Sequence, residues 1–129
     1  MDFDGVINIL LGSTLGLTLR LFIKYNFKTK IFFYFKNSFI VNVLSSLFLG
    51  IFVALSPSNK NLLLFFSVGF LGCFSTFSSF IYQLFILIQQ RKYLSLIIYY
   101  IEVLVLSFLF FCLGYFITLT LINWIKNIY

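Results

Sequence analysis

The sequence predicts an all-α integral membrane protein with four transmembrane helices. Hydrophobic residues make up 62% of the chain and charged residues only 9%, a composition typical of membrane proteins rather than of small soluble domains. Four apolar stretches, each long enough for a bilayer-crossing helix of ~20 residues, cover 6–23, 38–55, 62–88 and 95–124. Because the connections between them are short, we expect residues 1–129 to form a single four-helix transmembrane domain.

The first stretch, 6–23, is expected to remain as a helix and not to be removed as a signal peptide. Asp2 and Asp4 precede it, whereas the leader of a signal peptide is basic. Arg20 lies at its trailing end. The guanidinium either reaches the membrane surface, as long basic side chains do near helix ends, or forms part of an electropositive vestibule. Its position in the sequence leaves both interpretations open.

The second stretch carries a strongly polar side chain, Asn42, between the apolar runs "FIV" and "VLSSLFLG". A polar residue within a span faces protein or a pore rather than lipid. Asn42 therefore either holds two helices together through a hydrogen bond or lines the path of a solute. The loop that follows, "SPSNKN" at 56–61, contains the only proline of the chain.

The third stretch is unusual in its centre, where seven of the thirteen residues from Ser67 to Ser79 are Gly, Ser or Thr. Backbone that leaves the helical conformation inside a membrane persists only where protein or a water-filled cavity satisfies its polar groups. We therefore expect a helix broken at its centre. The alternative is that these small residues let neighbouring helices pack closely.

The fourth stretch contributes Tyr99 and Glu102, the latter being the only acidic residue within any predicted span. An ionisable group inside a membrane pairs with a base, carries protons or reaches to the interface. We expect Glu102 to lie near the interface.

Several classes of function are excluded by composition. The chain has no histidine, and its two cysteines, Cys73 and Cys112, are not at metal-ligand spacing. It offers neither a pair of carboxylates within a span nor a nucleophile beside a base, so we do not expect an enzyme. The net charge of +6 comes from basic residues at helix ends, which sets orientation in the membrane and does not suggest nucleic acid.

The distribution of basic residues predicts the orientation. Four helices place the first and third loops (24–37 and 89–93) on one side, and the second loop and both termini on the other. The first side holds seven basic residues and the other two. The seven are Arg20, Lys24, Lys28, Lys30, Lys36, Arg91 and Lys92, and the two are Lys60 and Lys126. Loops rich in Lys and Arg stay in the cytoplasm, so both termini are expected outside it.

The polar groups of the spans are hydrogen-bond donors without matching negative charge, which suits an anion. They are the amide of Asn42 and the hydroxyls of Ser75, Thr76, Ser78, Ser79 and Tyr99. Phe77 and Phe80 lie three residues apart and would share a helix face, where the positive edge of a ring is a weak partner for an anion. Since the chain has 20 Phe, ordinary core packing remains the alternative for this pair.

Three segments together resemble the CrcB/Fluc family of fluoride channels. They are "GSTLGLTLR" at 12–20, "NSFIVNVLSSLFLG" at 37–50 and "GFLGCFSTFSSF" at 69–80. The resemblance implies an antiparallel dimer with two fluoride pores and a structural sodium ion (Na+) at its centre. It also implies passive efflux of fluoride that protects the cell against fluoride toxicity, from a position in the inner (plasma) membrane.

The same resemblance implies roles for individual residues. The fluoride pathway would use Asn42, Phe77, Ser78, Phe80 and Tyr99, with Arg20 in the vestibule. Sodium would be held by the backbone carbonyls of Gly72 and Ser75, and carbonyl oxygens suit a hard cation of this kind.

The sequence departs from the family pattern at four positions. Cys73 and Ser45 stand where the family has glycine, and Val103, beside the unexpected Glu102, stands where the family usually has a pore serine. A homodimer of protomers inserted both ways needs little charge asymmetry, whereas this chain is strongly asymmetric. We therefore hypothesise a dimer with an oppositely oriented homologue.

Two other functions stay open. A small dual-topology drug/proton antiporter also forms antiparallel dimers, but it needs a membrane-embedded carboxylate, and the first span has none. A non-conducting membrane subunit would use its small residues and Asn42 for packing alone.

Overall fold

The computed structural model describes residues 2–26 and 32–129 and is helical throughout, apart from short turns. Residues 27–31 of the first predicted loop, which include Lys28 and Lys30, lie outside these ranges. The elements follow in the order α1 (Phe3–Asn26), α2 (Phe32–Leu55), α3 (Lys60–Leu63), the π-helix η1 (Leu64–Leu71), α4 (Gly72–Phe74), α5 (Phe77–Gln89) and α6 (Tyr93–Ile128). The prediction of an all-helical fold is confirmed for the described residues, which contain no strand.

Length and hydropathy mark three to four of these segments as candidate membrane spans. Phe3–Asn26, Lys60–Gln89 and Tyr93–Ile128 each have the length and apolar character to cross a bilayer. Within α2, the apolar helix Phe39–Leu55 is shorter. These four segments correspond to the four stretches expected from the sequence.

Two helices are longer than the apolar stretches that predict them. α2 begins at Phe32, six residues before the predicted span at 38, so the run "FFYF" lies within the helix. α6 has 36 residues, about 54 Å at 1.5 Å per residue. The apolar core of a bilayer is only ~30 Å thick, so α6 is long enough to extend beyond it.

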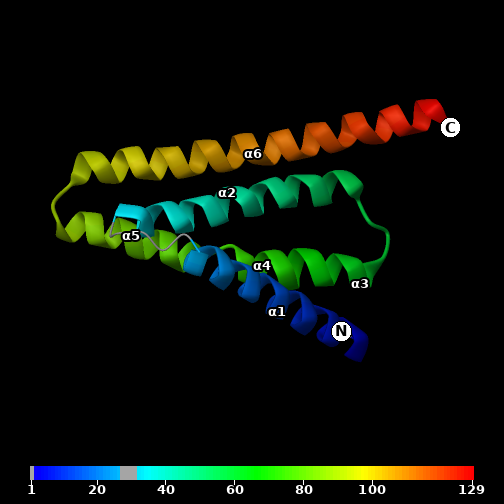
Figure 1. Ribbon diagram of the computed structural model, residues 1–129, viewed down its shortest axis with the longest axis horizontal. Helices are drawn as coiled ribbons and strands as arrows, with labels where there is room; N and C mark the ends of the chain where they lie inside the picture. Colours follow the sequence, from blue (N-terminus) through cyan, green and yellow to red (C-terminus); the bar gives the residue numbers. More distant parts are fainter. Residues whose placement is uncertain (1, 27–31) are drawn as a thin grey trace.

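Four layers of chain lie side by side (Figure 1). α6 runs along one edge, α2 lies next to it, the segment from α3 to α5 follows, and α1 crosses that segment at an angle. Both termini and the α2–α3 turn lie at one end, and the α5–α6 turn lies at the other. The second and third loops therefore lie at opposite ends of the described structure.

α1 packs on η1 through glycines that leave no room for a side chain. A Cβ added to Gly12 would lie 2.2 Å from the carbonyl oxygen of Phe65, and one added to Gly16 would lie 2.3 Å from that of Phe70. From the other helix, a Cβ on Gly69 would lie 2.6 Å from the carbonyl oxygen of Ile9. Small residues at helix contacts let backbones approach closely in membranes, and part of the small-residue content of the third span serves this purpose.

α2 and α6 form a second close pair in the same way. A Cβ on Gly50 would lie 2.2 Å from the carbonyl oxygen of Phe111, and one on Gly114 would lie 2.5 Å from that of Leu47. The molecule therefore consists of two tightly packed helix pairs, α1 with η1 and α2 with α6. The candidate site lies where the second pair meets the third segment.

Helical backbone in the third segment stops for two residues between α4 and α5. Ser75 has φ −75° and ψ 150°, and Thr76 has φ −137° and ψ 100°, both in the extended region. The Ser75 amide still donates to the Leu71 carbonyl at 3.0 Å. The α-helix resumes at Phe77, so the two extended residues lie within the stretch that is rich in Gly, Ser and Thr.

Candidate functional site

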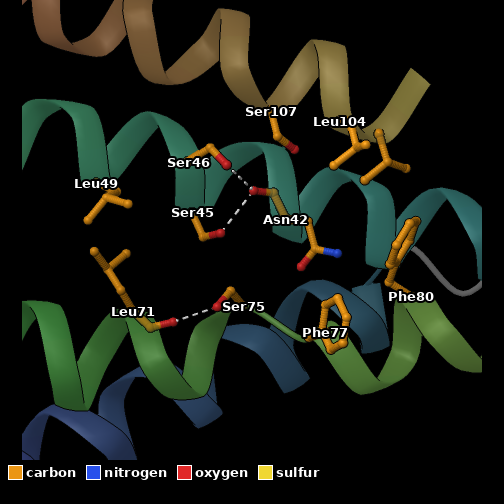
Figure 2. Close-up of a pocket in the computed structure, with 11 residues that line it drawn as sticks. Asn42, Ser45, Ser46, Leu49, Leu71, Ser75, Phe77, Phe80, Leu104 and Ser107 are labelled. Atoms are coloured by element: carbon orange, nitrogen blue, oxygen red, sulfur yellow. Dashed lines mark hydrogen bonds between the residues drawn. The ribbon is translucent and has the colours of Figure 1, made fainter. Parts of the chain in front are cut away.

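A cavity of about 330 Å³ lies beside the two extended residues, between α2, the third segment and α6 (Figure 2). Polar but uncharged side chains and apolar side chains share its wall. The lining residues are Asn42, Ser45, Ser46, Leu49, Leu71, Ser75, Phe77, Phe80, Val103, Leu104 and Ser107. None of these described lining residues carries a formal charge, so any polar solute in the cavity meets dipoles rather than ions.

Asn42 connects α2 to the extended backbone at Thr76. Its Oδ1 accepts a hydrogen bond from the Thr76 amide at 3.0 Å, and its Nδ2 donates to the Thr76 carbonyl at 3.4 Å. Non-helical backbone groups in a membrane need such partners, because lipid offers none. The interhelical contact considered for Asn42 is therefore present. Since an amide nitrogen carries two hydrogens, a second N–H is left for the cavity that Asn42 also lines.

The hydrogen bond that the Thr76 amide donates to Asn42 also affects the backbone carbonyl of Gly72. In an unbroken α-helix the Thr76 amide would donate to the Gly72 carbonyl, four residues earlier. Here that amide donates to Oδ1 of Asn42 instead. Gly72 is exposed, and a Cβ added to it would meet nothing within 4 Å. Its carbonyl is thus released from its usual helical donor on an open face of the chain.

Three serine hydroxyls of the cavity wall donate to backbone carbonyls. Ser45 and Ser46 both donate to the carbonyl of Asn42, at 2.9 and 3.0 Å, and Ser75 donates to that of Leu71 at 2.9 Å (Figure 2). Hydroxyls in helices commonly bond back to carbonyls three or four residues earlier.

Phe77 and Phe80 both line the cavity, with ring centroids 6.2 Å apart. Phe80 is buried and packs against two tyrosines of α6, at 5.8 Å from Tyr99 and 6.0 Å from Tyr100. Phe77 is 75% exposed. Packing within the chain therefore accounts for Phe80 but not for Phe77.

Gln83 is a polar residue of this region that sequence reasoning missed. Its side chain is fully buried, and its Oε1 accepts a hydrogen bond from the hydroxyl of Tyr99. Its Nε2 has no hydrogen-bond partner among the described residues. Leaving such a donor unpaired costs about 1–3 kcal/mol. The signal in the sequence was the spacing of three residues between Phe80 and Gln83, which puts both on one helix face.

The structure does not bring all of the expected site residues together. Asn42, Ser75, Phe77 and Phe80 share the cavity, and Tyr99 lies next to it through its contact with Phe80. Three others, Ser78, Arg20 and Gly72, are not among the lining residues. Ser78 and Gly72 are exposed, and Arg20 is half-buried on the face of α1 that carries Gly12 and Gly16.

Val103 and Glu102, where the fourth span departs from the family pattern, have different surroundings. Val103 is buried and lines the cavity, whereas Glu102 is exposed and is not among the lining residues. Ser107, one turn further along α6, also lines the cavity and was not singled out from the sequence. No group of three or more His, Cys, Asp or Glu that could hold a metal ion occurs in the described ranges.

These features define a small helical membrane protein with an open cavity that offers uncharged polar groups. Comparison with known proteins identifies the family. The family model described as "CrcB-like protein, Camphor Resistance (CrcB)" matches residues 7–115, and the chain belongs to this family.

Three relatives carry more specific names. "Fluoride-specific ion channel FluC 2" of Prochlorococcus marinus subsp. pastoris (strain MED4) is 69% identical over 95% of this chain and 100% of its own length. The protein of the same name from Prochlorococcus marinus (strain MIT 9312) is 54% identical, covering 91% of this chain and 96% of its own. "Fluoride-specific ion channel FluC 1", also of strain MED4, is 38% identical over 64% of this chain and 75% of its own.

The bonds between Asn42 and Thr76 generate a prediction about stability. Asn42→Ala removes the partner of both backbone groups of Thr76, so we expect the free energy of unfolding to fall by about 1–3 kcal/mol. The Thr76 amide should also exchange its hydrogen faster, as measured by mass spectrometry in micelles. Asn123→Ala, at an exposed position of α6, is the matched control. Unchanged exchange at Thr76 in Asn42→Ala would contradict the assignment.

Proposed function

We propose that the chain is a subunit of a fluoride-specific channel through which fluoride leaves the cell passively. The observation that carries the proposal is the uncharged, hydrogen-bonding cavity between Asn42 and Phe80, in a chain that is 69% identical to a protein named as a fluoride-specific ion channel. Passive efflux lowers the fluoride concentration of the cytoplasm, and this would protect the cell against fluoride toxicity.

The chemistry of fluoride fits these groups. Fluoride is small and strongly hydrated, so it crosses a membrane only where close donors replace its water. The second N–H of Asn42 and the hydroxyl of Ser107, both in the wall of the cavity, are donors of this kind. The rings of Phe77 and Phe80 can add their positive edges, and Tyr99 adjoins Phe80. Arg20 would attract the anion from the vestibule.

The exposure of several site residues supports a two-subunit channel. Phe77 is 75% exposed, and Ser78 and Gly72 are also exposed. In an antiparallel dimer the same faces of two subunits would meet, so each pore would take residues from both chains. The fluoride pathway of Asn42, Phe77, Ser78 and Phe80 would then be complete only in the assembly.

A structural sodium ion at the centre of the dimer fits the backbone at the interruption. The Gly72 carbonyl has lost its usual helical donor to Asn42, and Ser75 is extended. Carbonyl oxygens are suitable ligands for a hard cation. We propose that Gly72 and Ser75 hold the ion through their backbone carbonyls, two from each subunit. The ion would fix the subunits together and would not be transported.

We further propose that the partner is an oppositely oriented homologue. The chain has seven basic residues on one side against two on the other, which favours a single orientation with both termini outside the cytoplasm. Strain MED4, the source of the 69% identical relative, has both a FluC 2 and a FluC 1. The pairing of two such chains in the inner membrane would supply the opposite orientation.

Two alternatives have less support. A proton-coupled antiporter needs a carboxylate in its transport path, and Glu102 is exposed and not among the residues that line the cavity. A non-conducting membrane subunit would use Asn42 only to hold Thr76. That function leaves the uncharged polar lining of the cavity without a role.

Fluoride efflux from liposomes tests the proposed function. Vesicles that contain the purified chain together with an oppositely oriented FluC homologue are expected to release fluoride and retain chloride, and vesicles with the chain alone are measured for comparison. Phe80→Ile removes the ring beside Asn42 and should abolish the release. Phe108→Ile, an exposed ring of α6, should leave it unchanged. Selective release that Phe80→Ile does not affect would contradict the assigned path, and an absence of release in both preparations would contradict the function.

The orientation proposal has its own test. Reporter tags on the two termini should both be found outside the cytoplasm in nearly all molecules, because the loops with seven basic residues stay inside. Neutralising Arg91 and Lys92 should produce a mixed orientation. Tags found on both sides in comparable amounts for the unaltered chain would argue for a homodimer.

A further inference from the structure

The last turns of α6 extend past the helix on which α6 packs. α2 runs parallel to α6 and ends at Leu55 (Figure 1). Five residues earlier, Gly50 packs on α6 between Phe111 and Tyr115. Because the two helices rise equally per residue, α2 ends level with about residue 118 of α6. Thr118 is also the last residue of α6 that is buried, and Figure 1 shows the end of α6 beyond the α2–α3 turn.

The tail of α6, residues 121–128, continues the apolar stripe that α2 covers earlier in the helix. Leu121, Ile125 and Ile128 follow Gly114 by seven, eleven and fourteen residues, close to two, three and four whole turns. They therefore lie on the same side of α6 as Gly114, which packs on α2. The three side chains are 54%, 50% and 56% exposed. Since α2 has ended at this level, the stripe needs another cover.

The other side of the tail is polar. Asn123, Lys126 and Asn127 lie there, and all three are exposed. Trp124, the only tryptophan of the chain, lies at the border between the two sides and is 64% exposed. Tryptophan and aliphatic residues on one side of a helix, with lysine on the other, are typical of segments at the boundary between lipid headgroups and acyl chains.

The dimensions of a bilayer put the tail at this boundary. Arg91 and Lys92 are charged and exposed, so α6 enters the hydrocarbon near Tyr93. A helix tilted by 0–40° needs about 20–26 residues to cross ~30 Å of hydrocarbon. α6 then leaves the hydrocarbon between about residues 113 and 119. The tail begins just after this exit, in the headgroup region.

We propose that the α6 tail is a membrane anchor whose apolar stripe inserts among the lipids at the headgroup boundary. In water the stripe would stay uncovered, and in hydrocarbon Lys126 would lose its hydration. The boundary suits both sides of the helix, because the Lys126 ammonium can donate to lipid phosphate while the stripe faces acyl chains. An anchored tail holds α6 at a fixed depth, and α6 carries the cavity residues Val103 and Ser107.

The single tryptophan makes the depth of the tail measurable without a label. The full chain is placed in lipid nanodiscs, in which both faces of the bilayer are open to the solution. Lipids brominated near the glycerol end of the acyl chain should quench the fluorescence of Trp124 more strongly than lipids brominated near the chain terminus. Iodide in the solution should quench it several-fold less than it quenches free tryptophan amide.

Two sets of substitutions distinguish the two sides of the tail. A variant that combines Leu121→Ser, Ile125→Ser and Ile128→Ser removes the apolar stripe. Its iodide quenching should rise to nearly the value for free tryptophan amide, and its quenching by brominated lipids should be lost. The matched control combines Asn123→Ala with Asn127→Ala on the polar side and should leave both kinds of quenching unchanged. None of these positions is buried, so the helix content measured by circular dichroism should stay the same.

Three results would overturn the anchor. Iodide quenching of the unaltered chain equal to that of free tryptophan amide would mean that the tail projects into water. Strongest quenching by the deepest bromines would mean that the tail stays in the hydrocarbon. Weak quenching by iodide and by every brominated lipid, with or without an added FluC homologue, would mean that protein covers the stripe. The measurement does not require fluoride conduction, so its outcome is separate from that of the proposed function.

Discussion

The centre of this molecule depends on two hydrogen bonds between the side chain of Asn42 and the backbone of Thr76. A membrane provides no partner for backbone that leaves the helix, so an interruption in a span persists only if side chains pair with it. Asn42 meets this need from a neighbouring helix. The bond that Oδ1 accepts from the Thr76 amide also releases the Gly72 carbonyl from its usual donor, and Asn42 lines the cavity as well. One side chain therefore takes part in both the interruption and the cavity wall.

Close packing of two helix pairs fixes the positions of the helices around the interruption. Gly12 and Gly16 bring α1 onto η1, and Gly50 and Gly114 bring α2 onto α6, each at backbone contact distance. These contacts fix the helix that carries Asn42 relative to the wall that carries Val103 and Ser107. Phe77 and Gly72 are among the residues that this packing leaves exposed, and the proposed second subunit would cover them.

The sequence predicted the helical fold and the four apolar stretches because hydrophobic length alone determines them. It also pointed to Asn42 and Phe80, since a polar residue in a span and a residue in a family motif are visible without coordinates. It could not show that Thr76 is the partner of Asn42, a contact across 34 positions, nor that α2 begins at Phe32. Gln83 was missed because the burial that gives its amide significance is a property of tertiary packing.

Fluoride efflux by Asn42→Asp tests the central claim most directly. A carboxylate keeps an oxygen that accepts from the Thr76 amide, so the shorter of the two bonds should be retained, although the bond to the Thr76 carbonyl is lost. Assembly of the variant is therefore measured alongside its efflux. It loses the N–H donor and adds a negative charge that repels an anion. The account predicts a folded, assembled protein whose fluoride efflux is lost. Efflux at the unaltered rate from assembled Asn42→Asp would contradict the claim that this amide both holds the interruption and binds the anion in transit.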